Sequence, residues 1–161
     1  MSTKSSPSEL TVTWQCTPFA ELTAGEVYAA LEARQKVFVV EQKCPYLDAD
    51  GADQFAIHLL GWRSTADGLV VSAYARLLAP GVKYPEPSIG RVLTTPDVRG
   101  SGLGKAVIAE AIQRVEDAGW GSSIRIAAQM YLEAFYEGFG FRRVSEPFLE
   151  DDIWHVEMLR G

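Results

Sequence analysis

Residues 88–113 constrain the fold of this chain more than any other stretch. A strand-like apolar run ends at Pro96, glycines alternate with other residues from Gly100 to Gly104, and an apolar helical stripe starts at Lys105. Glycine lets a backbone turn tightly and approach a ligand closely, because it has no Cβ. Unpaired N–H groups at the start of a helix attract anions. The stretch therefore predicts either a phosphate-binding strand, loop and helix or a plain turn between two elements.

The spacing of the glycines excludes two common phosphate-binding loops. A dinucleotide-binding fingerprint would need its third glycine where Lys105 stands. A Walker loop would need a glycine at Arg99 and a hydroxyl residue at Ala106. The pattern that fits is Arg-x-x-Gly-x-Gly, formed by Arg99, Gly102 and Gly104.

Length and composition predict one soluble globular domain. With 161 residues, we expect a loose polar tail over residues 1–9 and a single domain over 10–161. The net charge of −6 argues against nucleic-acid binding, which needs an excess of lysine and arginine. No apolar run has the ~20 residues of a membrane span, and no signal-peptide core is present. We therefore expect a cytoplasmic protein that binds neither nucleic acid nor membrane.

Neither the cysteines nor the aspartates predict a metal site. Cys16 and Cys44 match no metal-binding spacing, and they are either two buried free thiols or a disulfide. The aspartate-rich loop that begins at Asp48 departs from the EF-hand pattern at Ala52 and Leu59. We expect no metal.

Periodicity predicts helices that cover a mixed sheet, an α/β (α+β) arrangement. Thr23 and Glu26 form a capping-box pattern before a helix, and Asp67-Gly68 predicts the turn of a hairpin. The remaining elements are expected in this order: a strand over 10–16, hairpin strands over 56–62 and 69–78, a helix over 103–118 that ends at Gly119, a strand over 123–129, a helix over 132–138, a strand over 141–144, an acidic loop over 146–152, and a last strand over 154–158.

Two polar residues within apolar patterns have both a structural and a functional interpretation. Arg34 interrupts an apolar helical face that includes Phe38, and Glu41 lies seven residues further on. Arg34 either pairs with Glu41 above the core or borders a polar pocket, or both. His58 lies in the first hairpin strand, where it is either a hydrogen-bonded structural residue or a base.

Two further segments resemble a known family. The run 131–141 resembles the Ala-x-x-Phe-Tyr-x-x-x-Gly-Phe segment of the GNAT superfamily of acetyltransferases, with Phe135, Tyr136, Gly140 and Phe141 at the matching positions. The Arg-x-x-Gly-x-Gly loop about thirty residues earlier resembles the acetyl-coenzyme A loop of the same superfamily. Residues 34–50 resemble its ElaA-like branch. The resemblance covers most of residues 22–160 and implies a mixed, mostly antiparallel sheet, splayed at the cofactor cleft, with helices on both faces.

The resemblance implies roles for individual residues. The pantetheine arm of coenzyme A (CoA) would pair with the backbone of Val92, Leu93 and Thr94, and Tyr136 would protonate the departing thiolate unless it is only a packed aromatic. Gln129 stands where the family often has asparagine, so its bond to the cofactor is open. Lys105, at the start of the helix, would add positive charge near the pyrophosphate. The pyrophosphate itself would lie on the backbone N–H groups of Arg99, Gly100, Ser101, Gly102, Leu103 and Gly104.

The implied reaction is acetyl transfer from acetyl-CoA to a primary amine of a small molecule or peptide, in a ternary complex. An alkylammonium must lose a proton before it attacks, and Glu41, Asp53 or His58 could accept it. A backbone N–H near Leu93 could stabilise the thioester oxygen. The acceptor would be chosen by Arg34, Phe38, Glu41 and Asp53. A non-catalytic acyl-CoA sensor and a scaffold for protein interaction are the alternatives, and a homodimer is possible.

Overall fold

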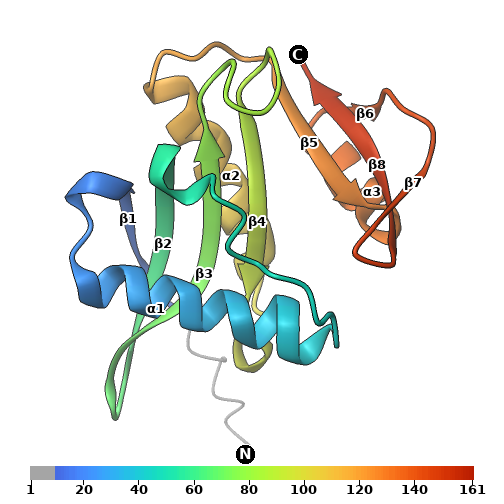
Figure 1. The fold of residues 1–161 in the computed structure, drawn as a ribbon. Coiled ribbons are helices and arrows are strands. Elements are labelled where there is room, and N and C mark those ends of the chain that lie inside the picture. Colours follow the sequence, from blue (N-terminus) through green and yellow to red (C-terminus); the bar gives the residue numbers. More distant parts are fainter. Residues whose placement is uncertain (1–9) are drawn as a thin grey trace, which may run out of the picture.

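The computed structural model describes residues 10–161, which form one sheet with helices on both faces (Figure 1). The predicted tail over residues 1–9 lies outside the described residues. The strands are β1 (Thr13–Pro18), β2 (Ala56–Thr65), β3 (Gly68–Leu78), β4 (Ser88–Thr94), β5 (Ile124–Gln129), β6 (Phe141–Arg143), β7 (Phe148–Glu150) and β8 (Ile153–Arg160). The main helices are α1 (Ala24–Arg34), the π-helix η2 (Gln35–Glu41), α2 (Leu103–Asp117) and α3 (Glu133–Glu137). Short 3₁₀ turns are η1 (Phe19–Glu21), η3 (Asp53–Phe55), η4 (Pro96–Val98) and η5 (Met130–Leu132).

The sheet is mixed, with one parallel contact near its middle. Its strand order is β1-β2-β3-β4-β5-β8-β6, and β7 pairs with β8. All neighbours are antiparallel except β4 and β5, which share the single register pair Ser88 and Arg125. Beyond that pair the two strands diverge (Figure 1). The predicted fold class, a mostly antiparallel sheet splayed between two central strands, is confirmed.

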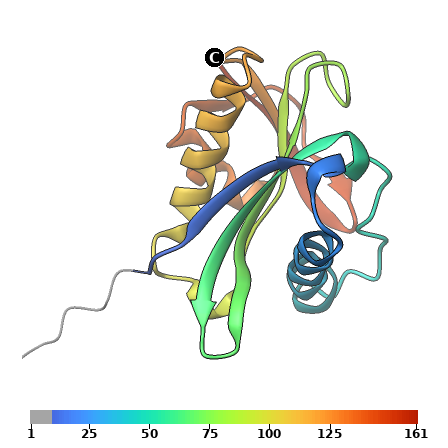
Figure 2. The ribbon, with the colours of Figure 1, turned by 90° about the vertical axis from the view of Figure 1, so that its left-hand side faces the viewer.

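Each face of the sheet has its own core. The helix α1 covers one face, while α2 lies on the other (Figure 2). The apolar stripe of α2 packs against β3, β4 and β5 through Leu103, Val107, Ile108, Ala111, Ile112 and Val115. On the α1 face, Tyr74 and Leu93 pack against Ala33 and Val37. The layers therefore place β3 and β4 between α1 and α2, and β4 is the strand that diverges from β5.

Local signals fixed several element boundaries. The capping box is present, because the Thr23 hydroxyl accepts from the Glu26 N–H at 3.1 Å and Glu26 accepts from the Thr23 N–H at 2.8 Å. The hairpin of β2 and β3 turns at Asp67-Gly68, and Gly119 follows α2 with φ +75°. All three predictions are confirmed.

The prediction of an acidic loop over 146–152 is wrong in part. Phe148–Glu150 forms β7, which pairs with β8 through a two-residue turn of Asp151 and Asp152. Both turn residues have positive φ, 52° and 61°, which aspartate tolerates and which a tight hairpin requires. The charge of the segment concealed a strand of only three residues.

The state of the cysteines, possible metal ligands and the length of the helices can be compared with the sequence-based expectations. Cys16 and Cys44 are free thiols, and each is partly exposed rather than buried. Across residues 10–161, no group of histidine, cysteine or acidic side chains could hold a metal ion. None of the helices in this part of the chain is long and apolar enough to cross a membrane.

Candidate functional site

A cleft of about 780 Å³ opens where β4 and β5 diverge. Its walls are the ends of both strands, the π-helix η2, the loop that follows it, and β8. The predicted site residues that line the cleft are Phe38, Glu41, Val92, Leu93, Thr94, Arg99, Gly104, Gln129 and Tyr136. Eight others, namely Arg34, Asp53, His58, Gly100, Ser101, Gly102, Leu103 and Lys105, are not part of this lining.

A bulge in β4 contributes to the divergence. Tyr74 pairs with Leu93 and Arg76 pairs with Gly90, so two residues of β4 oppose one residue of β3. Arg91 lies in the bulge with φ +50°, an uncommon backbone conformation for a residue with a side chain. A bulge bends its strand and adds local twist. The end of β4 is thereby turned away from β5.

The glycine loop presents unpaired N–H groups beside the cleft. Gly100 and Gly102 have φ values of +81° and +87°, and a Cβ added to either would meet no atom within 4 Å. Two N–H groups in this segment are engaged, because Arg99 donates to the Pro96 carbonyl and Leu103 donates to the Ser101 hydroxyl. Within the described residues, those of Gly100, Ser101, Gly102, Gly104 and Lys105 have no acceptor. N–H groups in this arrangement could accept an anion of at least two oxygens.

The contribution of Leu103 differs from the prediction. Its side chain is 5% exposed and packs in the core under α2, and its N–H is already bonded. Leu103 anchors the loop rather than offering it a donor.

Arg99 joins the glycine loop to the end of the π-helix η2. Its Nη1 and Nη2 donate to the two carboxylate oxygens of Glu41, each at 2.6 Å, and Nη2 also donates to the Thr94 carbonyl at 3.0 Å. Hydrogen bonds from Arg99 lower the pKa of Glu41. Glu41 is therefore held ionised by the loop, and the predicted Arg34–Glu41 pair is wrong. The change from α-helix to π-helix after Arg34 alters the angle between the two side chains.

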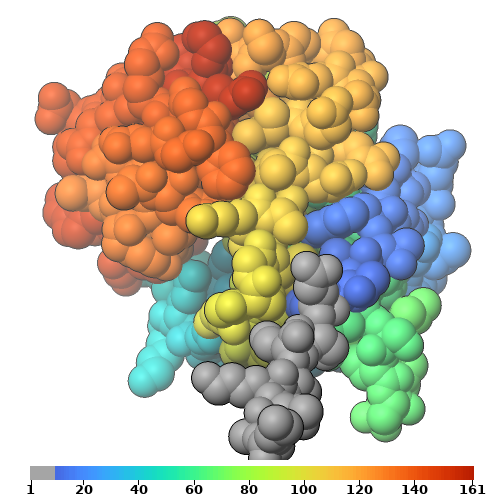
Figure 3. Space-filling model, turned by 180° about the vertical axis from the view of Figure 1, so that it is seen from behind, coloured from blue at the N-terminus to red at the C-terminus, as the bar shows by residue number. Residues whose placement is uncertain are grey.

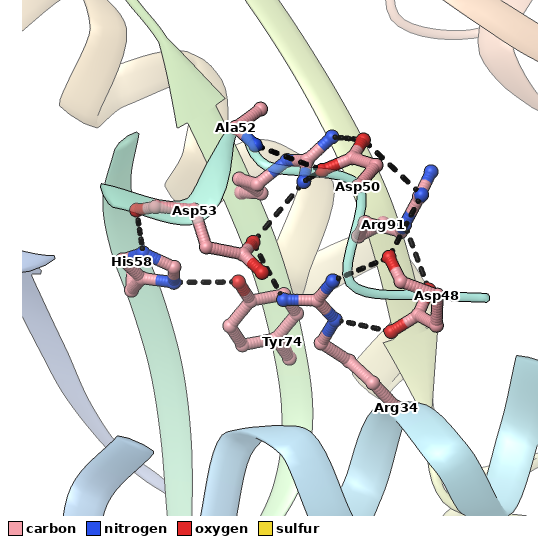
Figure 4. Close-up of polar contacts among 9 residues, drawn as sticks. Arg34, Asp48, Asp50, Ala52, Asp53, His58, Tyr74 and Arg91 are labelled. Carbon is pink, nitrogen blue, oxygen red and sulfur yellow. Dashed lines mark hydrogen bonds and ion pairs between the residues drawn. The ribbon is translucent and has the colours of Figure 1, made fainter. Parts of the chain in front are cut away.

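Arg34 instead belongs to a network of three arginines and three aspartates (Figure 4). It is 1% exposed, and it binds Asp48 through Nε and Asp53 through Nη1, both at 2.7 Å. Arg76 binds Asp50 at 2.7 Å and Asp53 at 3.1 Å, and Arg91 binds Asp48 at 2.8 Å. The network fixes the loop over 48–53 against α1, β3 and the bulge of β4.

This network removes Arg34 and Asp53 from the predicted acceptor contacts. The three positive and three negative charges compensate one another, and neither Arg34 nor Asp53 reaches the cleft lining. Their role in this structure is to hold the wall of the cleft in place.

His58 is enclosed by the same network. It is 3% exposed, its Nε2 donates to the Asp53 carbonyl at 2.8 Å, and its Nδ1 accepts from the Tyr74 hydroxyl at 2.6 Å (Figure 4). Burial lowers the pKa of His58, which keeps the ring neutral. Both nitrogens of His58 are bonded and the residue is not part of the cleft lining, so these contacts favour the structural interpretation over that of a base.

As the pH is lowered, the buried network should make the stability of the fold decrease in two stages. Burial lowers the pKa of His58, so below about pH 6.5 the unfolded chain binds a proton at His58 that the folded chain does not bind, and stability falls. Hydrogen bonds from Arg76 lower the pKa of Asp50, whose stabilising effect is complete above about pH 4 and is lost at lower pH. Urea unfolding between about pH 8 and pH 3 should show both stages, and His58→Gln should remove the upper one. Equal stability at about pH 8 and pH 5 would contradict this expectation.

Tyr136 lies at the base of the cleft within an aromatic cluster. Its ring makes edge-to-face contacts with Phe135 at 5.3 Å and with Phe141 at 5.9 Å, and the residue is 8% exposed. Burial raises its pKa to about 12, so the hydroxyl keeps its proton at neutral pH. Among residues 10–161 this hydroxyl has no hydrogen-bond partner. Tyr136 is both packed and available as a proton donor.

Gln129, at the end of β5, connects the two sides of the cleft. Its Nε2 donates to the Gln42 side chain at 3.4 Å, and its Oε1 accepts from the Tyr131 hydroxyl.

A second hollow of about 740 Å³ lies between α2 and α3, lined by Lys105, Ala106, Ala109, Ala134, Phe135, Gly138 and Phe139. On this back face, α2 (yellow to orange) borders the C-terminal elements (orange to red; Figure 3). Lys105 therefore lines the hollow between α2 and α3, next to the glycine loop.

Comparison with known proteins assigns the family. The sequence model of the acetyltransferase (GNAT) domain matches residues 67–160. The chain belongs to the GNAT acetyltransferase family. This GNAT chain is 42% identical to the UPF0039 protein sll0451 of Synechocystis sp., over 92% of its own length and 94% of that protein.

Solved structures agree with the assignment. The crystal structure of an acyl-CoA N-acyltransferase from Pseudomonas aeruginosa superposes with a TM-score of 0.87 at 42% identity, covering 94% of the GNAT chain and all of the other. That of Escherichia coli ElaA gives a TM-score of 0.83 at 35% identity, again over 94% of this chain and all of the other. The resemblance to the ElaA-like branch is confirmed.

His155 was not among the predicted site residues, although it lines the cleft. It lies in β8, pairs in register with Gln129 and lines the cleft of the GNAT chain. The alternation of β8 carried a signal, because His155 faces away from the buried Val156. The alternation places His155 on one face of the sheet, but it does not show whether a cleft or another packed element lies on that face.

Proposed function

We propose that the protein is an N-acetyltransferase that moves an acetyl group from acetyl-CoA to a primary amine. One observation carries the proposal: the glycine loop, with its unpaired N–H groups, stands beside a cleft between splayed strands that also contains a protonated, buried tyrosine. The chemistry of the cleft accords with the family, whose relatives include a protein described as an acyl-CoA N-acyltransferase. We further propose that the enzyme acts in the cytoplasm on a small molecule or a peptide.

The loop residues fit a CoA thioester as co-substrate. The pyrophosphate would accept hydrogen bonds from the N–H groups of Gly100, Gly102 and Gly104, and the ammonium of Lys105 would add positive charge. Backbone groups of Val92, Leu93 and Thr94 line the cleft and would pair with the pantetheine arm. When bound, the thioester supplies an acyl carbon that an amine can attack.

The cleft would then support direct transfer. The loop and β4 hold the thioester while the acceptor amine approaches from the η2 side, so both reactants are oriented before bonding. The Tyr136 hydroxyl, with its pKa raised by burial, would donate its proton to the departing sulfur. A thiolate with a pKa near ~8.5 is a fair leaving group without help. Tyr136 should therefore accelerate the reaction without being indispensable.

Tyr136→Phe should lower kcat by about 100-fold, the lower end of the range for a general acid. The dissociation constant for CoA should change by less than about threefold, because the aromatic packing is kept. Thiol release from acetyl-CoA with a panel of primary amines measures the first quantity, and calorimetry with CoA measures the second. Tyr28→Phe, which removes a hydroxyl from an exposed position on α1, is the matched control and should match wild type.

Two results would contradict the proposal. CoA binding without thiol release for any amine would indicate a sensor rather than an enzyme. Equal turnover of wild type and Tyr136→Phe would remove Tyr136 from the reaction.

A further inference from the structure

His155 lines the cleft at the edge of β8 that pairs with the end of β5. It is 8% exposed, its ring stacks on Phe148 at 5.9 Å between centroids, and it lies beside Gln129 in the sheet. Gln129 and Tyr136 line the same cleft. The imidazole is therefore held in one orientation next to the space that the reactants would share.

The hydrogen bond of His155 fixes its tautomer. Nδ1 lies 2.7 Å from the Ile153 carbonyl oxygen, and because a carbonyl can only accept, Nδ1 must carry the hydrogen. The neutral ring then has its lone pair on Nε2. The Glu150 carboxylate lies 3.7 Å from Nε2, and it cannot donate a hydrogen bond when ionised. Nε2 is thus left as a proton acceptor on a residue that lines the cleft.

The earlier candidates for a base are all engaged. Both oxygens of Glu41 are bound by Arg99, and Asp53 is bound by Arg34 and Arg76. His58 holds the opposite tautomer, with Nε2 donating to a carbonyl and Nδ1 accepting from Tyr74. Of the candidates considered among the described residues, His155 alone combines a place in the cleft with an unengaged basic atom.

We propose that His155 is the general base that deprotonates the acceptor amine. This inference rests on the proposed acetyl transfer and names a group for its first proton. Nε2 takes one proton from the ammonium, directly or through one water, and so frees the nitrogen lone pair. The N–C bond forms as the amine attacks the thioester carbon, and the C–S bond breaks. The second amine proton replaces the one that Tyr136 gives to the sulfur, and the proton on His155 leaves to solvent.

Glu150 would assist as a positioning residue. Once His155 is protonated, the carboxylate 3.7 Å from Nε2 stabilises the imidazolium. Glu150 is about half exposed, so the effect is small. Glu150→Gln should lower kcat by less than about tenfold.

The central test compares His155→Ala with wild type, using the primary amine that wild type acetylates fastest. We expect kcat to fall by about 100-fold or more, CoA affinity to change by less than about threefold, and added imidazole to restore a measurable part of the rate. Trp154→Ala, an exposed neighbour whose side chain is not part of the cleft lining, should keep wild-type turnover. If wild type is active and His155→Ala is equally active, the inference about His155 is overturned while the proposed function stands. The same holds if His155→Ala is impaired but imidazole does not rescue it. A wild type that acetylates no amine overturns the proposed function as well.

A second measurement requires no variant. The chain has 2 histidines, and the structure gives them opposite neutral tautomers. A long-range proton–nitrogen correlation spectrum at about pH 8, where an ordinary imidazole is neutral, should show one ring protonated at Nδ1 and one at Nε2. Two rings protonated at Nε2 would show that His155 has no free lone pair at that atom, and would overturn the assignment.

Discussion

Gly102→Glu should abolish CoA binding while the protein remains folded. Gly102 has φ +87° and caps α2 within the segment whose N–H groups are unpaired. A glutamate there would strain the left-handed backbone and set a carboxylate against the bound pyrophosphate. Loss of two charge-assisted hydrogen bonds, at about 1.5–3 kcal/mol each, corresponds to at least about a 100-fold weaker complex. Calorimetry with CoA measures this change directly.

Gly119→Glu is the matched control. Gly119 lies just beyond the other end of α2 with φ +75°, and a Cβ there would also meet no atom within 4 Å. The two variants add the same side chain in the same backbone conformation, so they should lose similar stability. Only Gly102→Glu should lose CoA affinity. If both variants bound CoA like wild type, the glycine loop would not be the pyrophosphate site.

Arg34→Ala should cause the largest loss of stability among single substitutions in the network. The guanidinium is 1% exposed, and its removal leaves the Asp48 and Asp53 carboxylates without one of their partners inside the fold. Breaking a buried ion pair by removing one member costs about 3–5 kcal/mol. For a chain of this size, the loss corresponds to a fall in melting temperature of about 6–20 °C. Thermal unfolding followed by circular dichroism measures it.

Arg143→Ala shows what an exposed pair contributes. Arg143 binds Glu133 at 2.6 Å, but its side chain is 40% exposed. Surface pairs of this kind contribute little to stability, because water and salt screen the two charges. A melting temperature for Arg34→Ala no lower than that of Arg143→Ala would show that the buried network does not hold the cleft wall.

The parts of the fold that the sequence predicted are those set by neighbours along the chain. The capping box at Thr23 and Glu26, the Asp67-Gly68 turn and the glycine spacing in the loop all act within a few residues. Such signals are read directly from residue order. They were sufficient for a mixed sheet covered by helices, whereas the splay of that sheet was implied only by the resemblance to the GNAT superfamily.

The partners of charged side chains could not be predicted in the same way. Arg34 bonds to Asp53, 19 positions away, and Arg99 bonds to Glu41, 58 positions away. These pairs form only when the loop over 48–53 and the π-helix are folded against β4. The periodicity of an ideal α-helix placed Arg34 and Glu41 on one side, and the π-helix removed that relation.

His155 shows the same limit at the site itself. Its strand was predicted, yet its tautomer depends on the Ile153 carbonyl and its exposure depends on the gap beside β5. A short strand, β7, supplies both the stacking ring of Phe148 and the nearby carboxylate of Glu150. Because β7 was interpreted as a loop, the surroundings of His155 could not be inferred.

The most direct test of the account is to follow the acetyl group itself. The protein would be incubated with acetyl-CoA carrying an isotopically labelled acetyl group and with a panel of primary amines, and the products identified by mass spectrometry. We expect the label in an amide of at least one amine, formed in proportion to released thiol and absent with Gly102→Glu. Thiol release with the label only in free acetate, or no transfer to any amine, would contradict the assignment of this cleft as an N-acetyltransferase site.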